Sequence, residues 1–185
     1  RRQRQMCIRD SWKIYVVGSV EYQYPNHLFQ AGYFLDKKYY DENTIDFKHL
    51  LLSEKNQSLL KDIQNSNSVG VHIRRGDYMT KQNLVIFGNI CTQKYYHDAI
   101  RIITEKVNDA VFYVFSDDIS WVQTHLDIPN AVYVNWNTGE SSIYDMYLMS
   151  SCKYNIIANS TFSYWAARLN KKTNMVIYPS KWYNT

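Results

Sequence analysis

The sequence has few cysteines and no long apolar run, and each absence excludes a class of protein. Among its 185 residues are only Cys7, Cys91 and Cys152, an odd number at distant positions. This spacing does not build a disulfide framework, so we expect reduced, buried thiols in a cytosolic protein. A zinc site made of Cys91, His97 and Cys152 has no supporting ligand spacing, and we expect no metal. No stretch approaches the roughly 18 apolar residues of a membrane-spanning helix.

Two glycine-rich nucleotide-binding loops are also absent. The chain contains neither Gly-x-x-x-x-Gly-Lys-Ser/Thr nor Gly-x-Gly-x-x-Gly. The first loop cradles phosphates in P-loop enzymes, and the second binds the pyrophosphate of dinucleotides. Their absence argues against P-loop enzymes and ordinary dinucleotide oxidoreductases.

Excess positive charge is small once the start of the chain is set aside. Residues 1–11 have no helical or strand period and resemble a translated sequencing-adapter peptide, so we treat them as a non-native segment. Without their four arginines and one aspartate, Lys+Arg falls from 21 to 17 and Asp+Glu from 17 to 16, leaving +1 in place of +4. This balance gives no support for binding to nucleic acid.

Residues 69–185 alternate short β-branched or aromatic runs with amphipathic stretches. The runs predict strands, and the stretches predict helices because their apolar residues recur at helical spacing. Apolar strands separated by such helices imply parallel strands covered on both faces, which is a Rossmann-like α/β fold. The predicted strands are 69–73, 110–116, 131–136, 154–160 and 174–179, and the predicted helices are 92–107, 118–126, 141–152 and 161–170.

Local signals support these helices. In the helix at 92–107, one face is expected to carry Tyr96, Ala99, Ile100, Ile103 and Val107. The expected N-caps are Thr92, Asp118, and Ser141 or Ser142.

Residues 12–68 have too little apolar periodicity to close a second core. A strand is expected within 12–25, and residues 53–68 predict a helix with Leu59, Leu60 and Ile63 inward, followed by a polar loop. We interpret 12–68 as the remnant of an N-terminal domain with a linker helix. Residues 69–185 are then the ligand-binding domain.

Polar residues gather where four consecutive predicted strands end. Ligands of open parallel sheets bind outside the carboxyl ends of the strands, close to helix N-termini. Arginine donates two parallel hydrogen bonds to phosphate or carboxylate, and hydroxyls at a helix start supply further donors. The pattern therefore predicts an anion site at this edge. The four segments are His72–Asp77, Phe115–Asp118, Asn135–Ser142 and Ala158–Ser163.

Each of these groups also has a structural alternative. Arg74 and Arg75 are equally compatible with surface ion pairs. One of Asp117 and Asp118 is expected to cap the following helix. As metal ligands the two aspartates would need a third ligand, which the sequence does not identify. His72 fits a satisfied core histidine as well as a ligand.

Three motifs together resemble the bacterial α-1,2-fucosyltransferases. They are "VHIRRGDY" (71–78), "YVFSDD" (113–118) and "DMYLMSSCKYNIIANSTFSYWAA" (145–167), and the likeness extends over about residues 32–183. The resemblance implies an inverting enzyme that moves L-fucose from GDP-fucose to a galactose 2-hydroxyl. It also implies that this chain is the C-terminal, donor-binding half of a two-domain GT-B-type glycosyltransferase, because a glycine-rich N-terminal opening is absent.

Carried over by motif position, the resemblance also implies roles for particular residues. Arg74 is expected to contact the β-phosphate, with Arg75 assisting, and to replace the metal that other glycosyltransferases use. His72 and one of Asp117 and Asp118 are expected to contact guanosine. The rest of the donor site is expected to be Asn159, Ser160, Thr161, Phe162 and Ser163.

Several questions stay open at this stage. Asp77 and Glu140 are both candidates for the base that accepts the hydroxyl proton. Alternative functions are another GDP-fucose-dependent fucosyltransferase, an inactive GDP-binding remnant, and a metal-dependent phosphohydrolase using Asp117 and Asp118. The acceptor is expected to be a galactose-terminated glycan, and the tyrosine-rich segment 22–40 is a candidate for contacting it. A cytoplasmic location, with peripheral association with the inner membrane, follows from the resemblance.

Overall fold

The computed structural model describes residues 22–24, 27–29 and 47–184. The chain divides into two compact units, residues 1–45 and 46–185. In the first unit, β1 (Tyr22–Tyr24) pairs antiparallel with β2 (His27–Phe29). The predictions made for residues 1–21, 25–26 and 30–46 lie outside the described residues.

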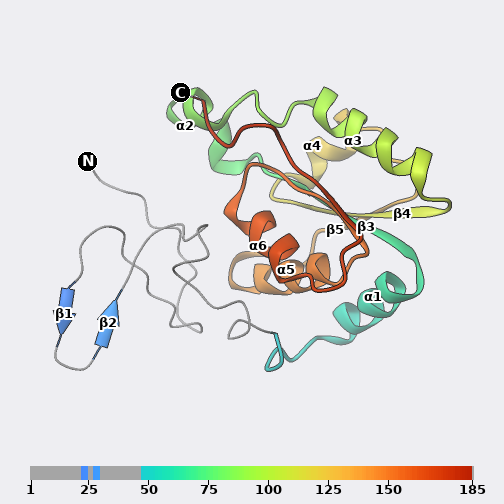
Figure 1. Ribbon diagram of the computed structural model, residues 1–185, viewed down its shortest axis with the longest axis horizontal. Coiled ribbons are helices and arrows are strands. Elements are labelled where there is room, and N and C mark those ends of the chain that lie inside the picture. The colour runs from blue at the N-terminus through green and yellow to red at the C-terminus, as the bar shows by residue number, and fades with distance from the viewer. Residues whose placement is uncertain (1–21, 25–26, 30–46, 185) are drawn as a thin grey trace. The chain divides into compact units, whose positions relative to one another are not determined.

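The second unit contains a five-stranded, all-parallel sheet, which confirms the predicted α/β fold with a parallel sheet (Figure 1). Its strand order is β5–β4–β3–β6–β7. The chain therefore builds outward from β3 to β5 and then returns to the other side of β3 for β6 and β7. The strands are β3 (Asn67–Ile73), β4 (Ala110–Ser116), β5 (Ala131–Val134), β6 (Tyr154–Ile156) and β7 (Met175–Ile177).

Helices cover both faces of this sheet (Figure 1). Alternation along β4 explains the two layers, because Phe112 and Val114 join the core with α3 and α4, whereas Tyr113 and Phe115 join the core with α5 and α6. The helices on the first face are α3 (Gln93–Lys106) and α4 (Ile119–His125), and those on the second are α1 (Glu54–Asn65), α5 (Ser142–Ser150) and α6 (Thr161–Leu169).

The predicted inward faces are largely confirmed. All five apolar residues named for 92–107 are buried. In α1, Leu59 and Ile63 are buried and Leu60 is half-buried. Because α1 packs on β3 and α5, the compact unit that holds the sheet begins at residue 46 and includes this helix.

Two of the expected N-caps form the expected hydrogen bonds. The Thr92 hydroxyl accepts from the backbone N–H of Tyr95 at 3.3 Å. The Asp118 carboxylate accepts from the backbone N–H of Trp121 at 3.1 Å. Ser141 precedes α5, but its side chain makes no capping hydrogen bond.

Two short helices were not anticipated from the sequence. They are η2 (Gly76–Met79) and α2 (Lys81–Phe87), with Thr80 capping α2 through its side chain. Their apolar residues do not form a buried stripe, since Val85 and Ile86 are exposed. Three predicted strands were too long, because 135–136, 157–160 and 178–179 lie outside the sheet. The first two of these segments carry part of the site.

Candidate functional site

The candidate site lies at the carboxyl edge of the sheet, next to β3 and β6. The crossovers run in opposite directions from these two strands, and open α/β sheets bind ligands at such a switch point. The register pairs Ile73 of β3 with Ser116 of β4. Arg74 and Asp117 therefore leave the sheet side by side. On the other flank, β6 ends at Ile156 and α6 begins at Thr161.

Arg74 is held between two carboxylates. Its Nη2 lies 2.7 Å from Oδ1 of Asp77, and its Nη1 lies 2.9 Å from Oδ2 of Asp117. The guanidinium carbon also lies 5.6 Å from the ring centroid of Tyr78. These contacts fix the guanidinium at the strand end, with its side chain 33% exposed.

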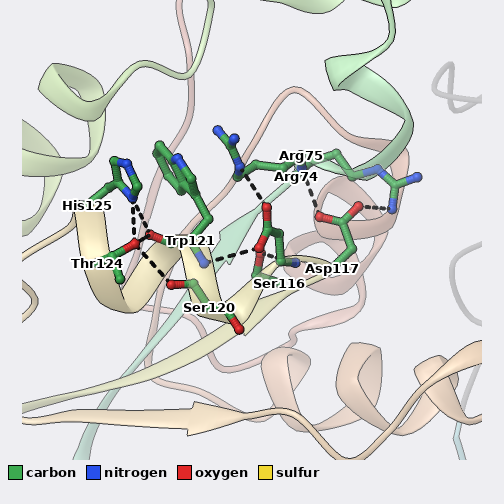
Figure 2. Close-up of polar contacts among 9 residues, drawn as sticks. Arg74, Arg75, Ser116, Asp117, Ser120, Trp121, Thr124 and His125 are labelled. Atoms are coloured by element: carbon green, nitrogen blue, oxygen red, sulfur yellow. Dashed lines mark hydrogen bonds and ion pairs between the residues drawn. The ribbon is translucent and has the colours of Figure 1, made fainter.

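Arg75 turns to a different carboxylate (Figure 2). Its Nε lies 3.2 Å from Oδ2 of Asp118, and its guanidinium stacks 3.6 Å above the ring of Trp121 in α4. Trp121 stacks in turn on His125, with ring centroids 4.5 Å apart. The two guanidinium groups therefore pair with different carboxylates, Arg74 with Asp77 and Asp117, and Arg75 with Asp118.

Asp117 fixes the backbone between the two arginines. Its Oδ1 accepts the backbone N–H of Arg75 at 2.8 Å, while Oδ2 pairs with Arg74. A Cβ at Gly76 would lie 2.4 Å from Oδ2 of Asp117, so glycine is the residue that allows this approach. Asp118 serves as the cap of α4, which matches the structural alternative considered from the sequence.

His72 is a buried, neutral side chain beside the site. It is 5% exposed, and its ring centroid lies 5.0 Å from that of Phe162 in α6. Burial, and then the neighbouring Arg74 charge, lower the pKa of His72 to about 3. Its buried Nδ1 has no hydrogen-bond partner within the described part of the chain. Buried polar atoms in folded proteins usually have a hydrogen-bond partner, and a bound ligand would supply one for this nitrogen.

The polar side chains at the start of α6 are buried, and two of them bond to backbone carbonyls. Asn159 donates from Nδ2 to the carbonyls of Phe87 and Trp182, at 3.2 and 3.1 Å. The Ser163 hydroxyl donates back to the carbonyls of Ala158 and Ser160. Both side chains are therefore committed to the backbone. Ser160 is the N-cap residue, and its hydroxyl makes no capping bond.

Tyr78 connects the two flanks of the site, and the sequence analysis did not single it out. Its hydroxyl donates to the carbonyl of Asn159 at 2.8 Å, and its ring stacks on Phe87 at 4.8 Å. The loop after β3 is thereby tied to the loop after β6. Tyr78 closes the motif 71–78, but the sequence does not indicate this contact, because it joins positions 81 residues apart.

A second polar network, also unanticipated, lies at the carboxyl end of β5. Asn137 donates from Nδ2 to Asp145 at 2.7 Å and to Asn56 at 3.1 Å. Asn56 also accepts from Nε1 of Trp136 at 2.8 Å. Burial raises the pKa of Asp145 to about 7, although the Asn137 hydrogen bond acts in the opposite direction. Glu140, the second base candidate, is exposed nearby in the short helix η3 (Gly139–Ser141).

The carboxylates at the site form ion pairs with arginines. Among the described residues, no three His, Cys, Asp or Glu side chains come together to hold a metal ion. Asp117 and Asp118 pair with Arg74 and Arg75. This pairing weighs against the phosphohydrolase alternative.

Comparison with known proteins identifies the family. A model described as glycosyl transferase family 11 matches residues 15–185. The chain belongs to glycosyl transferase family 11. An α-1,2-colitosyltransferase from Escherichia coli is 35% identical to this family 11 chain over 176 residues, which cover 90% of the chain and 57% of that protein. The O-antigen biosynthesis glycosyltransferase WbnK from Escherichia coli is 44% identical over 122 residues, covering 65% and 40%.

Relatives from animals also match about two thirds of the chain. Galactoside α-(1,2)-fucosyltransferase 2 from Pongo pygmaeus is 29% identical over 128 residues, covering 65% of this chain and 37% of that protein. A solved structure, the fucosyltransferase NodZ from Bradyrhizobium, covers 62% of this chain and 40% of its own, with 19% identity and a TM-score of 0.45. The chain thus spans about half the length of its two Escherichia coli relatives.

Proposed function

We propose that this chain is the C-terminal, donor-binding half of a two-domain GT-B-type glycosyltransferase. The whole enzyme would transfer L-fucose from GDP-fucose to the 2-hydroxyl of a galactose in a glycan, with inversion. The family membership supports a glycosyltransferase, and the parallel sheet with its switch point between β3 and β6 supports a nucleotide-sugar site. In domain terms, we propose a boundary near residue 46 in place of the predicted 68–69, with 12–45 in an N-terminal domain and the linker helix α1 packed on the donor domain.

One observation carries this proposal: Arg74 is fixed at the switch point between Asp77 and Asp117. As the bond between C1 of the sugar and the β-phosphate oxygen breaks, negative charge grows on the diphosphate. A guanidinium already held in place stabilises that charge without reorganising. Loss of one such donor typically costs about 10²–10³-fold in rate. Ser160 and Thr161, at the start of α6, would contact the diphosphate from the opposite flank.

The nucleoside would lie against His72 and Phe162. A neutral imidazole with a buried, unpartnered Nδ1 offers a base or ribose a hydrogen-bonding position without the cost of a buried charge. Asp117 and Asp118 support this site indirectly, through their ion pairs with the arginines. Arg75 would assist in the same indirect way, because its side chain lies on Trp121.

Two carboxylates are candidates for the base that accepts the acceptor hydroxyl proton. Asp77 lies nearer to the proposed reaction centre, since it contacts Arg74, and after leaving Arg74 it would have to reach the face of C1 opposite the diphosphate, where inversion places the acceptor. Glu140 follows β5, which lies two strands away from β3 in the sheet. We propose Asp77 for this role.

A colitosyl donor is the second candidate. The colitosyltransferase from Escherichia coli matches 90% of this chain. Colitose is L-fucose without its 3-hydroxyl, so the two donors share a guanosine diphosphate and differ in one hydrogen-bonding group. Transfer assays with both GDP-sugars distinguish the two. Equal turnover of a third GDP-sugar would instead favour a transferase that accepts several GDP-sugars. Binding of GDP without turnover of any GDP-sugar would favour an inactive remnant.

The proposed setting is the cytoplasmic face of a bacterial inner membrane, where a galactose-terminated acceptor would be assembled. Within the described ranges, no helix has the length and hydropathy needed to cross a bilayer. We also propose that the protein associates peripherally with the membrane and has no nucleic-acid partner. Co-sedimentation of the purified chain with lipid vesicles tests the membrane association.

A calorimetric titration tests the donor site. GDP should bind to the chain and UDP should bind much more weakly, and Arg74→Ala should reduce GDP affinity by at least tenfold. Arg101→Ala is the matched control, because Arg101 forms exposed ion pairs on α3. Equal binding of GDP and UDP, or unchanged binding in Arg74→Ala with an intact circular dichroism spectrum, would contradict the proposal.

A further inference from the structure

Without a ligand, Arg74 already has two anionic partners. Asp77 and Asp117 accept from its two terminal nitrogens at 2.7 and 2.9 Å. A diphosphate offers only acceptor oxygens, so it must compete with carboxylates for the same N–H groups. Together, the ion-paired arginines and aspartates at this loop, Arg74, Arg75, Asp77, Asp117 and Asp118, carry a net charge of −1. A dianionic group cannot bind well there until one carboxylate withdraws.

The two carboxylates beside Arg74 are held very differently. Asp117 also accepts the backbone N–H of Arg75, lies against Gly76, and is 26% exposed. The Asp77 side chain is 52% exposed and has the Arg74 contact as its one hydrogen bond among those of the described residues. Asp77 is therefore the carboxylate that can leave.

The backbone around Asp77 does not need to move for this exchange. Its carbonyl accepts from Nδ2 of Asn83 at 2.8 Å and from the backbone N–H of Thr80 at 3.3 Å. Asn83 is buried and is itself held by the Thr80 hydroxyl through its backbone N–H. Rotation of the Asp77 side chain alone would free Nη2 of Arg74, while Asp117 keeps its contact with Nη1.

We propose that Asp77 occupies the phosphate position of Arg74 in the absence of donor, and that the diphosphate displaces it. This inference rests on the proposed donor site and adds an exchange to it. Binding the donor then frees the same carboxylate that we assign as the base. In the transfer step, the acceptor O–H bond breaks and its proton goes to Asp77. The acceptor oxygen bonds to C1, and the C1–O bond to the diphosphate breaks with its electron pair on GDP.

Through this exchange, the availability of Asp77 as a base depends on whether the donor is bound. Without a diphosphate, Asp77 is ion-paired and turned toward Arg74; with it, the carboxylate is released at the same strand end. Donor binding before acceptor deprotonation follows from this arrangement.

Asp77→Asn tests the exchange, because it keeps the shape of the side chain and removes the competing charge. GDP affinity should rise about five- to tenfold, the range expected when an exposed ion pair need not be broken and a like-charge repulsion is lost. Guanosine, which has no phosphate, should bind the variant and the parent equally. A general structural change would alter both ligands.

A double-variant cycle shows whether the effect passes through Arg74. In the Arg74→Ala background, Asp77→Asn should bring no gain in GDP affinity. Asp98→Asn is the matched control, since Asp98 is an exposed aspartate paired with Lys94 and Arg101 on α3, and it should leave both ligands unchanged.

The outcomes separate this inference from the proposed function. If the parent chain binds GDP through Arg74 but Asp77→Asn binds it equally or more weakly, the exchange is wrong and the donor site stands. If the gain is the same in the Arg74→Ala background, the exchange is also wrong. If the parent chain binds no GDP, the donor site is wrong and the exchange falls with it.

Discussion

Asp145→Asn should change how the stability of this chain depends on pH. The Asp145 carboxyl is buried in the first turn of α5, and burial raises its pKa from 3.8 to about 7. Between these two values the folded state keeps a proton that the unfolded state has released. The stability of the parent chain therefore falls as pH rises from about 4 to about 7, and levels off above that.

The size of this effect follows from the two pKa values. A difference of about 3 pH units corresponds to about 4 kcal/mol at about 1.36 kcal/mol for each unit. The asparagine variant carries no charge at this position, and its side-chain oxygen can still accept from Asn137. The free energy of unfolding of the variant should therefore gain about 3–4 kcal/mol relative to the parent between pH 4 and pH 7.5.

Urea unfolding of both proteins across this pH range, followed by circular dichroism, measures the difference. Asp98→Asn is a useful control, because the hydrogen bond from Lys94 lowers the pKa of Asp98, so its contribution changes only below about pH 4 and its curve should run parallel to the parent from pH 4 to pH 7.5. The reasoning is refuted if the curves of the parent and Asp145→Asn run parallel from pH 4 to pH 7.5. A variant that loses stability at every pH would show that the hydrogen bond to Asn137 matters more than the charge.

Two further predictions concern residues that position the site. Trp121→Leu should weaken GDP binding about three- to tenfold, because it removes the aromatic face beneath Arg75. Trp121→Phe keeps an aromatic face and should bind GDP within about twofold of the parent. Calorimetric titration of both variants checks this, and equal losses of affinity would refute a stacking role. Asn159→Ala should lower the free energy of unfolding by about 2 kcal/mol, because the carbonyls of Phe87 and Trp182 both lose their amide donor. Urea unfolding measures it, and an unchanged midpoint would mean that water replaces the amide.

Local patterns were enough to predict the fold class and most of the elements. All five strands of the parallel sheet form within one or two residues of their predicted starts, because β-branched runs with both faces buried have few other solutions. The caps at Thr92 and Asp118 also form, since a capping side chain acts on residues three positions away. The short helix α2 escaped prediction because its apolar Val85 and Ile86 are exposed and leave no periodic signal.

That polar residues follow each strand can be read from the order of residues alone, and a parallel sheet brings such residues to one edge. The role of each polar residue depends instead on contacts that form when the chain folds. Arg74 and Arg75 are adjacent in sequence but pair with different aspartates, Asp117 and Asp118, which connect β4 to α4. The side chains of Asn159 and Ser163 donate to backbone carbonyls, and the buried Asp145 accepts from Asn137. Residue type and spacing fix which groups are available at the edge, whereas contacts between distant segments fix which of them a ligand can reach.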